Sequence, residues 1–515
     1  MLHNLLEEIG DSNPQALREI KGRLIPRNLI ISGGISAIGQ GFLWMPNQPH
    51  SVNSWINLFM TMSVVSVFTL IVVGTYMLVN DLYVEEKRGT LNFIRLSPTE
   101  AKNIFLGKII GVPLLLYFVI LLAVPLHLIA GIFGQIHLGL ILCFYVLTMA
   151  SCAFFYSITL VITLIGFQIQ SLASWSLAAV SFMFLSMIMT IPITNTPFDW
   201  LSLLSPTFIL YYMRYYHDYL SLEKVQFFHF PVGLSTGVMI ILALVNYGVL
   251  TYLNLAALSR QFYNRYAALS SKKISYIQAV YSGIMLIGFA MQTAENHVNN
   301  DSLPSNFYII LAMNLFFSAA MLGTLLPQHQ VLEEWATYHH GDKKSLIHDL
   351  IWSDKSPAIV AVAINQLILG GIISIWILTW GDFHKIILGW VCLFIQISMM
   401  LILAIITELI VVKFPPNPRL KQYQNQISGG LTFVGVCFIM AVPVGILPVL
   451  KIVPPAGSFV WMLLPIPWIA VHFSSPLQIL LGFLSHVTIL GLLGRKLKSN
   501  IQKLGSSSSF LPKNI

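Results

Sequence analysis

Twelve apolar segments, each nearly free of charged side chains, constrain the fold of this chain more than any other feature. A helix needs about 20 residues to cross the hydrocarbon core of a bilayer, and these segments are of that order. Lipid offers the backbone no hydrogen-bond partner, so a spanning segment must be a helix or a strand of a closed barrel. Because the apolar residues run continuously and do not alternate with polar ones, we expect helices. The predicted spans are approximately 29–45, 56–79, 106–133, 138–166, 171–192, 232–257, 276–294, 306–326, 357–380, 385–412, 428–450 and 476–494.

The composition excludes a soluble protein and argues against one that binds nucleic acid. Only 9% of the 515 residues are charged, whereas a soluble domain carries about a quarter. The net charge of +8 comes from basic residues that flank the apolar segments and form no run. That distribution is typical of the Lys and Arg excess on the cytoplasmic side of membrane proteins. We therefore predict an all-α integral membrane protein, surrounded by membrane lipid and without a nucleic-acid partner.

The basic residues also predict the orientation of the chain. With the N-terminus inside, all but four of the 28 Lys and Arg residues fall on the cytoplasmic side. The four predicted to lie outside are Arg214, Lys224, Lys385 and Lys451. This strong asymmetry predicts that both termini are cytoplasmic. We expect a multi-pass protein of the cell membrane, meaning the inner or plasma membrane.

Two further apolar stretches, 198–212 and 458–474, contain prolines and polar groups and differ from the full spans. Counting either one as a span would reverse the orientation of everything that follows it. Non-helical backbone is tolerated at membrane depth only where protein or a wet cavity satisfies its polar groups. We predict that both stretches form re-entrant or interfacial hairpins on the external side.

The order of irregular features repeats along the chain, which indicates an internal duplication. Glu85-Glu86 follows the second span, and Glu333-Glu334 follows the eighth, 248 positions later. The two interrupted stretches also occupy the same place in each half. General similarity between apolar helices would explain shared Leu and Ile, but not a shared order of charged loops and hairpins. The chain is therefore predicted to consist of two parallel six-helix halves, 1–270 and 271–515.

The segment 79–108 lies on the predicted cytoplasmic side, between the second and third spans. It is charged up to Arg88, is interrupted at Gly89 and continues as a short amphipathic stretch. Ser97 and Pro98 are typical of the N-cap and first position of the next helix. A simple connection does not need charges of both signs on a partly apolar element, so we predict a docking surface. The alternative is an amphipathic helix that anchors the bundle at the membrane face.

This segment resembles a known motif. The run EEKRGTLNFIRLSPT, followed by IFLGK, is similar to the coupling-helix region of type-two ATP-binding-cassette (ABC) transporter permeases. The residues that carry the resemblance are Glu85, Glu86, Gly89, Thr90, Leu91, Ser97, Pro98, Leu106, Gly107 and Lys108. The N-terminal stretch from Asn13-Pro14 to Arg23 resembles the entry segment of some of these permeases, and the six-helix pattern matches along 13–257. In the second half Glu333 and Glu334 remain, but the Gly-Thr-Leu sequence is absent.

The resemblance implies the permease of an ATP-driven exporter in a fused, double-length form. A separate cytoplasmic ATPase, a dimer that binds ATP and Mg²⁺, would grip one coupling helix from each half. Its closure would alternate access to a path between the halves and move the substrate outward. The residues implied in this coupling are Glu85, Glu86, Lys87, Arg88, Gly89, Thr90, Leu91, Glu333 and Glu334.

The sequence offers no pattern of an enzyme active site. A phosphate-binding loop needs Gly-x4-Gly-Lys-Ser/Thr, but the one Gly-Lys pair, Gly107-Lys108, lacks the first glycine and is followed by Ile109. The histidines between 339 and 348 lack the spacing of a metal site, and no HExxH occurs. We therefore expect no catalytic residue, metal or cofactor in this chain, with ATP hydrolysis on the partner subunit.

A secondary transporter driven by an ion gradient is the main alternative, and a non-transporting accessory protein is another. Ion-coupled carriers need membrane-embedded carboxylates, and Glu408 is the one acid well inside a predicted span. It lies just over a turn from Lys413, so a structural pairing is also open. Embedded polar groups either hydrogen-bond between helices or line a path. The candidate path or gate residues are His127, Asn365, Gln366, Glu408, Tyr212 and Arg214.

Overall fold

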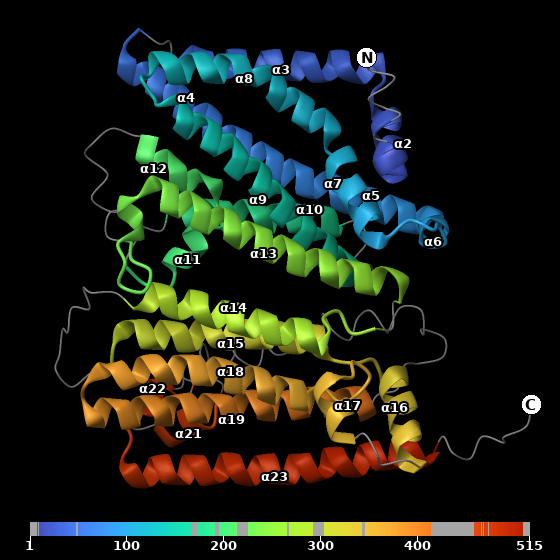
Figure 1. Ribbon diagram of the computed structural model, residues 1–515, viewed down its shortest axis with the longest axis vertical. Coiled ribbons are helices and arrows are strands. Elements are labelled where there is room, and N and C mark those ends of the chain that lie inside the picture. The colour runs from blue at the N-terminus through green and yellow to red at the C-terminus, as the bar shows by residue number, and fades with distance from the viewer. Residues whose placement is uncertain are drawn as a thin grey trace, which may run out of the picture. The chain divides into compact units, whose positions relative to one another are not determined.

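The computed structural model of the chain is all-helical over the residues it describes (Figure 1). These are residues 8, 10–47, 50–165, 172–190, 195–213, 225–264, 267–291, 303–341, 346–413, 458–464, 466, 468–471 and 473–507. Eleven of the described segments are long and apolar enough to cross a membrane. They are Pro26–Pro46, Val52–Arg88, Leu114–Phe133, Leu138–Leu164, Ala173–Thr190, Thr236–Tyr263, Lys272–Ala290, Ser305–Leu325, Ile359–Trp380, Phe383–Lys413 and Pro476–Ser506. The fold is that of an all-α, multi-pass membrane protein.

Eleven of the twelve predicted spans correspond to these segments, and the predicted span 428–450 lies outside the described residues. The largest difference concerns the third span, which was expected to start at 106 as one helix. It breaks into α7 (Ala101–Gly111) and α8 (Leu114–Phe133). Pro113 explains the break, because it has no N–H to donate to the carbonyl of Ile109. That carbonyl instead accepts a hydrogen bond from the Tyr117 hydroxyl at 2.9 Å.

The chain divides into two compact units. Unit 1 comprises Met1–Gln226 and Phe230–Tyr263, and unit 2 comprises Phe227–His229 and Asn264–Ile515. The boundary near residue 263 lies seven positions before the predicted one at 270. That each unit is one half of a duplicated permease stays a prediction.

Unit 1 is built from long helices that pack side by side. Helix α9 lies along α13, while α3 and α4 both pack against α8 (Figure 1). The helices of unit 1 besides α7 and α8 are α2 (Pro14–Arg23), α3 (Pro26–Asn47), α4 (Val52–Phe68), α5 (Gly74–Arg88), α6 (Thr90–Arg95), α9 (Leu138–Ile165), α10 (Leu172–Thr190), α11 (Asp199–Ser202), α12 (Ile209–Met213) and α13 (Thr236–Tyr263), with the 3-10 turns η2 (Pro206–Phe208) and η3 (Val232–Leu234).

Helices α4 and α5 form one continuous segment through a π-helical turn, η1 (Thr69–Val73). The Tyr156 hydroxyl of α9 donates to the carbonyl of Leu70 at 2.5 Å inside this turn. A Cβ on Gly74 would lie 2.1 Å from that hydroxyl oxygen, so glycine is needed for the tyrosine to enter. Insertion of a side chain into the helical ladder is a recognised cause of such turns. The 37-residue segment Val52–Arg88 therefore runs from one predicted membrane face to the docking segment without a loop.

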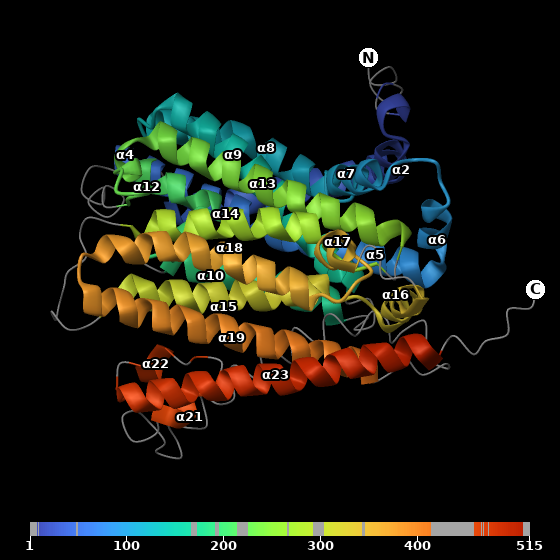
Figure 2. The same ribbon diagram turned by 60° about the horizontal axis from the view of Figure 1, so that its bottom comes forward.

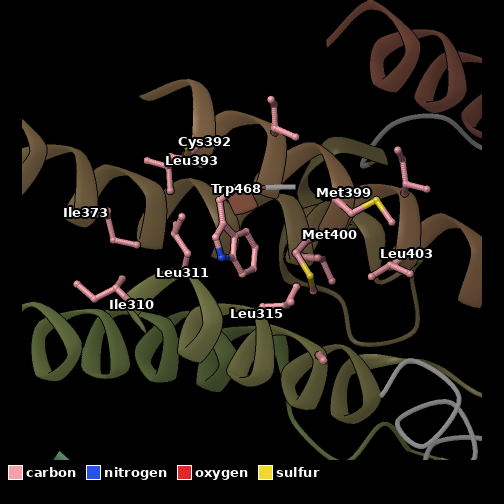
Figure 3. Packing of buried hydrophobic residues seen from close by; sticks show 14 of the residues in the cluster. Ile310, Leu311, Leu315, Ile373, Cys392, Leu393, Met399, Met400, Leu403 and Trp468 are labelled. Atoms are coloured by element: carbon pink, nitrogen blue, oxygen red, sulfur yellow. The ribbon is translucent and has the colours of Figure 1, made fainter. Parts of the chain in front are cut away.

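Unit 2 has a core of apolar side chains from α15, α18, α19 and α22. Figure 3 shows Trp468 of α22 beside Leu311 and Leu315 of α15 and the two methionines Met399 and Met400 of α19. Lipid is as apolar as these side chains, so close van der Waals packing holds such helices together. The helices of unit 2 are α14 (Lys272–Ala290), α15 (Ser305–Leu325), α16 (His329–Gly341), α17 (Leu346–Trp352), α18 (Ile359–Ile377), α19 (Phe383–Lys413), α21 (Ser458–Met462), α22 (Trp468–Val471) and α23 (Pro476–Ser507), with the 3-10 turn η4 (Leu378–Trp380).

Neither interrupted apolar stretch forms a spanning helix in the described residues. The first consists of α11, η2 and α12, and the second contains α21 and α22, all of five residues or fewer. Trp200 of α11 is buried, and its indole N–H donates to Asn246 Oδ1 of α13 at 3.1 Å. A buried side-chain contact therefore ties this irregular segment to α13. The external position of both stretches stays a prediction.

Candidate functional site

The predicted docking segment folds as three helical pieces joined by sharp turns. We call residues 81–108 the first elbow; it contains the end of α5, the short helix α6 and most of α7 (Figure 2). Helix α5 ends at Gly89, which has a left-handed backbone with φ 74° and donates its N–H to the Glu86 carbonyl at 3.0 Å. A residue with a Cβ would be destabilised by about 1–2 kcal/mol in that conformation. Glycine therefore lets the chain turn directly from α5 into α6.

Helix α6 has one buried and one exposed apolar face. Leu91 and Ile94 are 0% and 5% exposed, whereas Phe93 and Leu96 are 78% and 85% exposed. Residues three apart lie on one face of a helix. The first pair anchors α6 to unit 1, and the second pair, at its end, is free for another contact.

The last turn of α13 also holds the first elbow. The Arg95 guanidinium lies over the Phe262 ring, 5.4 Å from its centroid. Phe262 packs edge-on against Phe105 of α7, with ring centroids 5.2 Å apart. The Tyr263 hydroxyl donates to the Thr99 carbonyl at 2.6 Å. Side chains of α13, packed in turn on α7, thus hold the end of α6 and the residues that follow it.

The predicted N-cap at Ser97 is wrong. Helix α7 begins at Ala101, and no side chain caps its first turn. The Ser97 hydroxyl instead donates to the Ile94 carbonyl at 2.7 Å and closes the end of α6. The Thr99 carbonyl accepts a hydrogen bond from the Tyr263 hydroxyl, so a tertiary contact holds the non-helical stretch before α7 against α13.

A buried lysine is the electrostatic centre of the first elbow. Lys108 of α7 is 0% exposed. Its ammonium lies 2.7 Å from Asp81 Oδ2 and 2.6 Å from Glu85 Oε2. These two acids are four residues apart on one face of α5, so a single lysine reaches both. A third carboxylate, Glu19 of α2, is 3.7 Å from the ammonium.

Two arginines of α2 complete this ion network. Arg23 lies 2.8 Å from Asp81 and also pairs with Glu19. Arg18 pairs with Glu85 and lies 2.9 Å from Glu19. Burial alone would raise the pKa of Glu19, but the charge of the buried lysine and hydrogen bonds from both arginines outweigh it and lower that pKa. Three carboxylates within 4.8 Å of one another are therefore matched by three cations.

The pKa of the buried lysine responds to the same balance. Burial would lower the pKa of Lys108, because the charged form loses its hydration. The charges of Asp81, Glu85 and Glu19 outweigh that effect, so its pKa is raised. The ammonium is therefore kept charged in a place that water does not reach.

Asn13 connects α2 to α7. Its Oδ1 accepts from the N–H of Ala16 at 2.9 Å and caps α2, while its Nδ2 donates to the Asn103 carbonyl of α7 at 2.7 Å. The two parts of the sequence resemblance, around Asn13-Pro14 and around Gly107-Lys108, thus meet in one contact.

Helices α2 and α7 approach closely because α7 carries glycines where they meet. A Cβ on Gly107 would lie 2.7 Å from the backbone nitrogen of Ala16. We expect Gly107→Ala to destabilise unit 1 by about 1–3 kcal/mol and to displace α2. Thermal unfolding of the purified chain and hydrogen exchange of α2 would measure both effects.

The matched control for that substitution is Gly22→Ala on α2 itself. Nothing lies within 4 Å of a Cβ at Gly22. Alanine in a helix loses less entropy than glycine, so this change should be neutral or stabilising by up to about 1 kcal/mol. Equal effects of the two substitutions would refute the role assigned to the close contact.

The structure divides the predicted coupling residues of the first half into two groups. Glu85 belongs to the ion network, Leu91 is buried, and Glu86 is half-buried. The exposed residues are Lys87, Arg88, Gly89 and Thr90. Only the second group, together with the exposed apolar pair of α6, is available to a partner.

The corresponding region of unit 2, residues 329–358, is called the second elbow. Glu333 and Glu334 lie on α16, which packs against α23 through apolar side chains. Glu334 lies 3.4 Å from Lys355, with both side chains exposed. Glu333 is 3.9 Å from the His329 ring. Neither acid takes the place that Glu85 has in the first elbow.

A buried lysine nevertheless holds the second elbow. Lys272, at the start of α14, is 2% exposed. Its ammonium donates to the carbonyls of Leu350 at 2.7 Å and Pro357 at 3.1 Å. The Ser356 hydroxyl accepts a third bond at 2.5 Å. The segment before α18 is thus gathered around one cation, through oxygen atoms that carry no net charge.

Glu408 of α19 has a structural partner different from the one considered in the sequence. It is 1% exposed, and its carboxylate accepts a hydrogen bond from the Ala358 N–H at the start of α18. The first N–H groups of a helix have no hydrogen-bond partner inside it, so the Ala358 N–H needs an acceptor from elsewhere in the chain. Lys413 is exposed and forms no ion pair with Glu408 among the described residues.

Two candidate path or gate residues of unit 1 are held by hydrogen bonds. The His127 ring lies 2.8 Å from the Ser63 hydroxyl and 2.7 Å from the Tyr145 hydroxyl, which joins α8 to α4 and α9. Tyr212 is buried and donates to the Gly233 carbonyl at 2.7 Å. Both side chains thus take part in packing within the unit. Arg214 lies outside the described residues.

The candidate residues of α18 also join neighbouring helices. Asn365 Nδ2 donates to the Ser275 hydroxyl of α14 at 3.1 Å, and Gln366 Nε2 donates to the Ser318 hydroxyl of α15 at 2.6 Å. Their side-chain oxygens are buried without a hydrogen bond. Hydrogen bonding between helices, the alternative to lining a path, therefore accounts for the side-chain N–H groups of these two amides. It does not account for their side-chain oxygens.

The sequence reasoning missed several residues that build the two elbows. Glu19, Asp81 and Lys108 were outside the predicted coupling set, and Lys272 had no predicted role. One signal was available: Asp81 and Glu85 are spaced four apart at the end of a span, a spacing that suits a shared cation.

No protein-family model, no curated protein and no solved structure matches this chain. Its function is therefore inferred from its own residues and geometry.

Proposed function

We propose that this chain is the membrane-spanning permease of an ATP-driven ABC exporter, coupled to a separate cytoplasmic ATPase. One observation carries the proposal. Helix α6 exposes Phe93 and Leu96 by 78% and 85%, although its other face is anchored in unit 1. The sequence that forms α6 is also the run that resembles the coupling helix of type-two ABC permeases.

A rigid support favours transmission of force over simple anchoring. The ion network fixes the end of α5 to α2 and α7, and Phe262 and Tyr263 fix α6 to α13. Because α5 belongs to the continuous segment Val52–Arg88, a displacement of α6 would pass directly into a spanning helix. An ATPase that closes around ATP and Mg²⁺ could therefore move α5, α8 and α13 by pressing on α6.

The composition of the exposed face fits a protein partner. Phe93 and Leu96 supply apolar area, and the exposed Lys87 and Arg88 lie directly before Gly89. Protein interfaces combine such an apolar centre with a polar rim. On this proposal the contacts are made by Lys87, Arg88 and Phe93, while Glu85 acts as a positioning residue through Lys108.

The proposal treats the chain as two fused permease halves with both termini in the cytoplasm. Each unit contains spanning helices, an elbow before a further span and an interrupted apolar stretch before its last long helix. The second elbow, with Glu333 and Glu334, would then contact the second ATPase copy. The apolar character of the spans favours an amphipathic or lipid-like substrate, carried outward across the cell membrane.

The contacts of the embedded ionisable groups weigh against an ion-driven carrier. Glu408 accepts from the start of α18, and both ring nitrogens of His127 face hydroxyl groups. A proton relay requires groups that can change partners during transport. These residues are better explained as parts of the helix packing.

The double variant Phe93→Ser and Leu96→Ser tests the docking face. Removing two large apolar side chains from the centre of an interface costs about 1–4 kcal/mol each, so association with the ATPase should weaken at least tenfold. Affinity purification from native membranes, followed by identification of an ATPase with a phosphate-binding loop, would measure the retained fraction.

Phe230→Ser is the matched control for this experiment. Phe230 is 73% exposed, comparable to Phe93, but lies on the predicted external side. It should leave the association unchanged. A wild-type chain that carries substrate without any ATPase would overturn the proposal, as would full retention of the ATPase by the double variant.

A further inference from the structure

Helix α23 carries a group of basic side chains that no acidic residue of the helix neutralises. Arg495, Lys496, Lys498 and Lys503 are all exposed, and we call them the basic end of α23. The helix contains no Asp or Glu. None of the four cations forms an ion pair with a residue that the structure describes. The basic end therefore presents uncompensated positive charge at the surface of unit 2.

Two general causes of basic residues in membrane proteins do not account for this group. The helix dipole stabilises cations in the last turn of a helix, but no basic residue lies in the last turn of α23. The excess of Lys and Arg on the cytoplasmic side orients a chain without gathering them in one helix. Helix α13, the last long helix of unit 1, contains a single basic residue, Arg260. Exposed cations of the elbows, such as Arg18 and Lys355, have carboxylate partners.

The basic end continues the exposed apolar face of α23. Residues seven apart lie on nearly the same face of a helix. Leu477 and Leu484 are 65% and 50% exposed, and they lie three and two heptads before Lys498. Leu481 is 46% exposed and lies two heptads before Arg495. Exposed leucines of a spanning helix face lipid, so these two cations project from the lipid-facing side.

The position along the helix also matches the edge of a bilayer. Residues 476–493 contain no Lys, Arg, Asp or Glu. At about 1.5 Å per residue they extend about 27 Å, close to the roughly 30 Å of the hydrocarbon core. Arg495 and Lys498 follow directly, where the hydrocarbon ends and the phosphate groups of the lipids begin.

Helix α16 covers the opposite side of the basic end (Figures 1 and 2). Leu497 is buried in an apolar cluster with Leu332 and Trp335 of α16. A Cβ on Gly505 would lie 2.6 Å from the carbonyl oxygen of Ala336, so the two backbones meet closely. The second elbow thus packs against one side of the basic end, and Arg495 lies on the other.

We propose that the basic end of α23 binds the headgroups of anionic phospholipids at the membrane surface. Clusters of four or more Lys and Arg directly beside a spanning helix attract such lipids. The Arg495 guanidinium offers a phosphate two parallel N–H donors, and Lys498 adds a second cation on the same face. The headgroup supplies the negative charge that α23 lacks, while the acyl chains lie along Leu481 and Leu484. This contact requires neither an ATPase nor transport, so it stands apart from the function proposed above.

Native mass spectrometry of the full-length chain tests this site. The chain is released from nanodiscs of equal parts phosphatidylcholine and phosphatidylglycerol, and the lipids that stay bound are counted. Each Lys or Arg near an anionic surface contributes about fivefold in affinity, so the wild type should retain phosphatidylglycerol about fivefold or more over phosphatidylcholine. Arg495→Gln with Lys498→Gln should lose most of this preference. The charge-conserving pair Arg495→Lys with Lys498→Arg should keep it.

Lys102→Gln with Lys273→Gln is the matched control. Both lysines are exposed, and their replacement removes the same net charge from other helices. This control should keep the wild-type preference, and thermal unfolding should show that every variant is folded. The proposal would be overturned by equal retention of the two lipids in the wild type or by an unchanged preference in the Arg495 and Lys498 glutamine variant. An equal loss in the control would also overturn it, because net charge alone would then explain the binding.

Discussion

Replacing Lys108 by methionine is expected to destabilise unit 1 by about 3–5 kcal/mol, the cost of leaving buried charge without its partner. Methionine matches the length and apolar stem of lysine, so the cavity term is small. Asp81 and Glu85, which lie 2.7 and 2.6 Å from the ammonium, would then face each other with two arginines for three acids. The expected result is a large fall in the unfolding temperature and loss of protection in α2 and α7.

The control for this substitution is Lys102→Met on the same helix. Lys102 is exposed, and surface changes usually stay within about 0.5 kcal/mol. Adding Asp81→Asn to Lys108→Met restores the charge balance and should recover part of the loss, which thermal unfolding of all four chains would measure. Similar stabilities for Lys108→Met and Lys102→Met would rule out an energetic role for the network.

The spans and the first elbow could be predicted because their signals are local. An apolar run of about 20 residues defines a spanning helix wherever it packs. A glycine between a charged stretch and a short amphipathic one predicts the turn at Gly89. The break at Pro113 was missed, although proline is a local signal, because the apolar run continues through it. The predicted N-cap at Ser97 failed for a different reason, since the Ser97 hydroxyl bonds the end of the preceding helix and the stretch after it contacts Tyr263, 164 positions away from Thr99.

The ion network could not be predicted, because its members are distant in sequence. Lys108 lies 27 positions after Asp81, and Arg23 lies 58 positions before it. A charge pattern alone does not show whether an acid points outward to a partner or inward to a lysine. Glu85 therefore looked like a docking residue, and its position in the network is visible only in the structure. The same limit applies to Glu408, whose partner Ala358 is 50 positions away.

Each elbow is held by a buried lysine, but the two lysines have different partners. In the first elbow the ammonium is surrounded by carboxylates, so its charge is neutralised directly. In the second elbow Lys272 binds two carbonyls and a hydroxyl, and its charge is balanced from further away by Glu408, Asp354 and Asp349. A cation held by neutral oxygens depends on every one of those oxygens for its solvation.

Lys272→Met is expected to destabilise unit 2 by about 3–5 kcal/mol, the range for removing one partner of a buried charged contact. Three oxygen acceptors lose their donor in this variant. The effect should be concentrated between Leu350 and Pro357, whose carbonyls would lose their donor. Lys273→Met provides an unusually close control, since Lys273 is the next residue on the same helix and is exposed. Hydrogen exchange of α17 and the start of α18, together with thermal unfolding, would compare the two variants. Loss of protection in both, or in neither, would mean that the ammonium does not hold this segment. Loss in Lys272→Met alone would establish that the buried cation holds the segment from Leu350 to Pro357 in place.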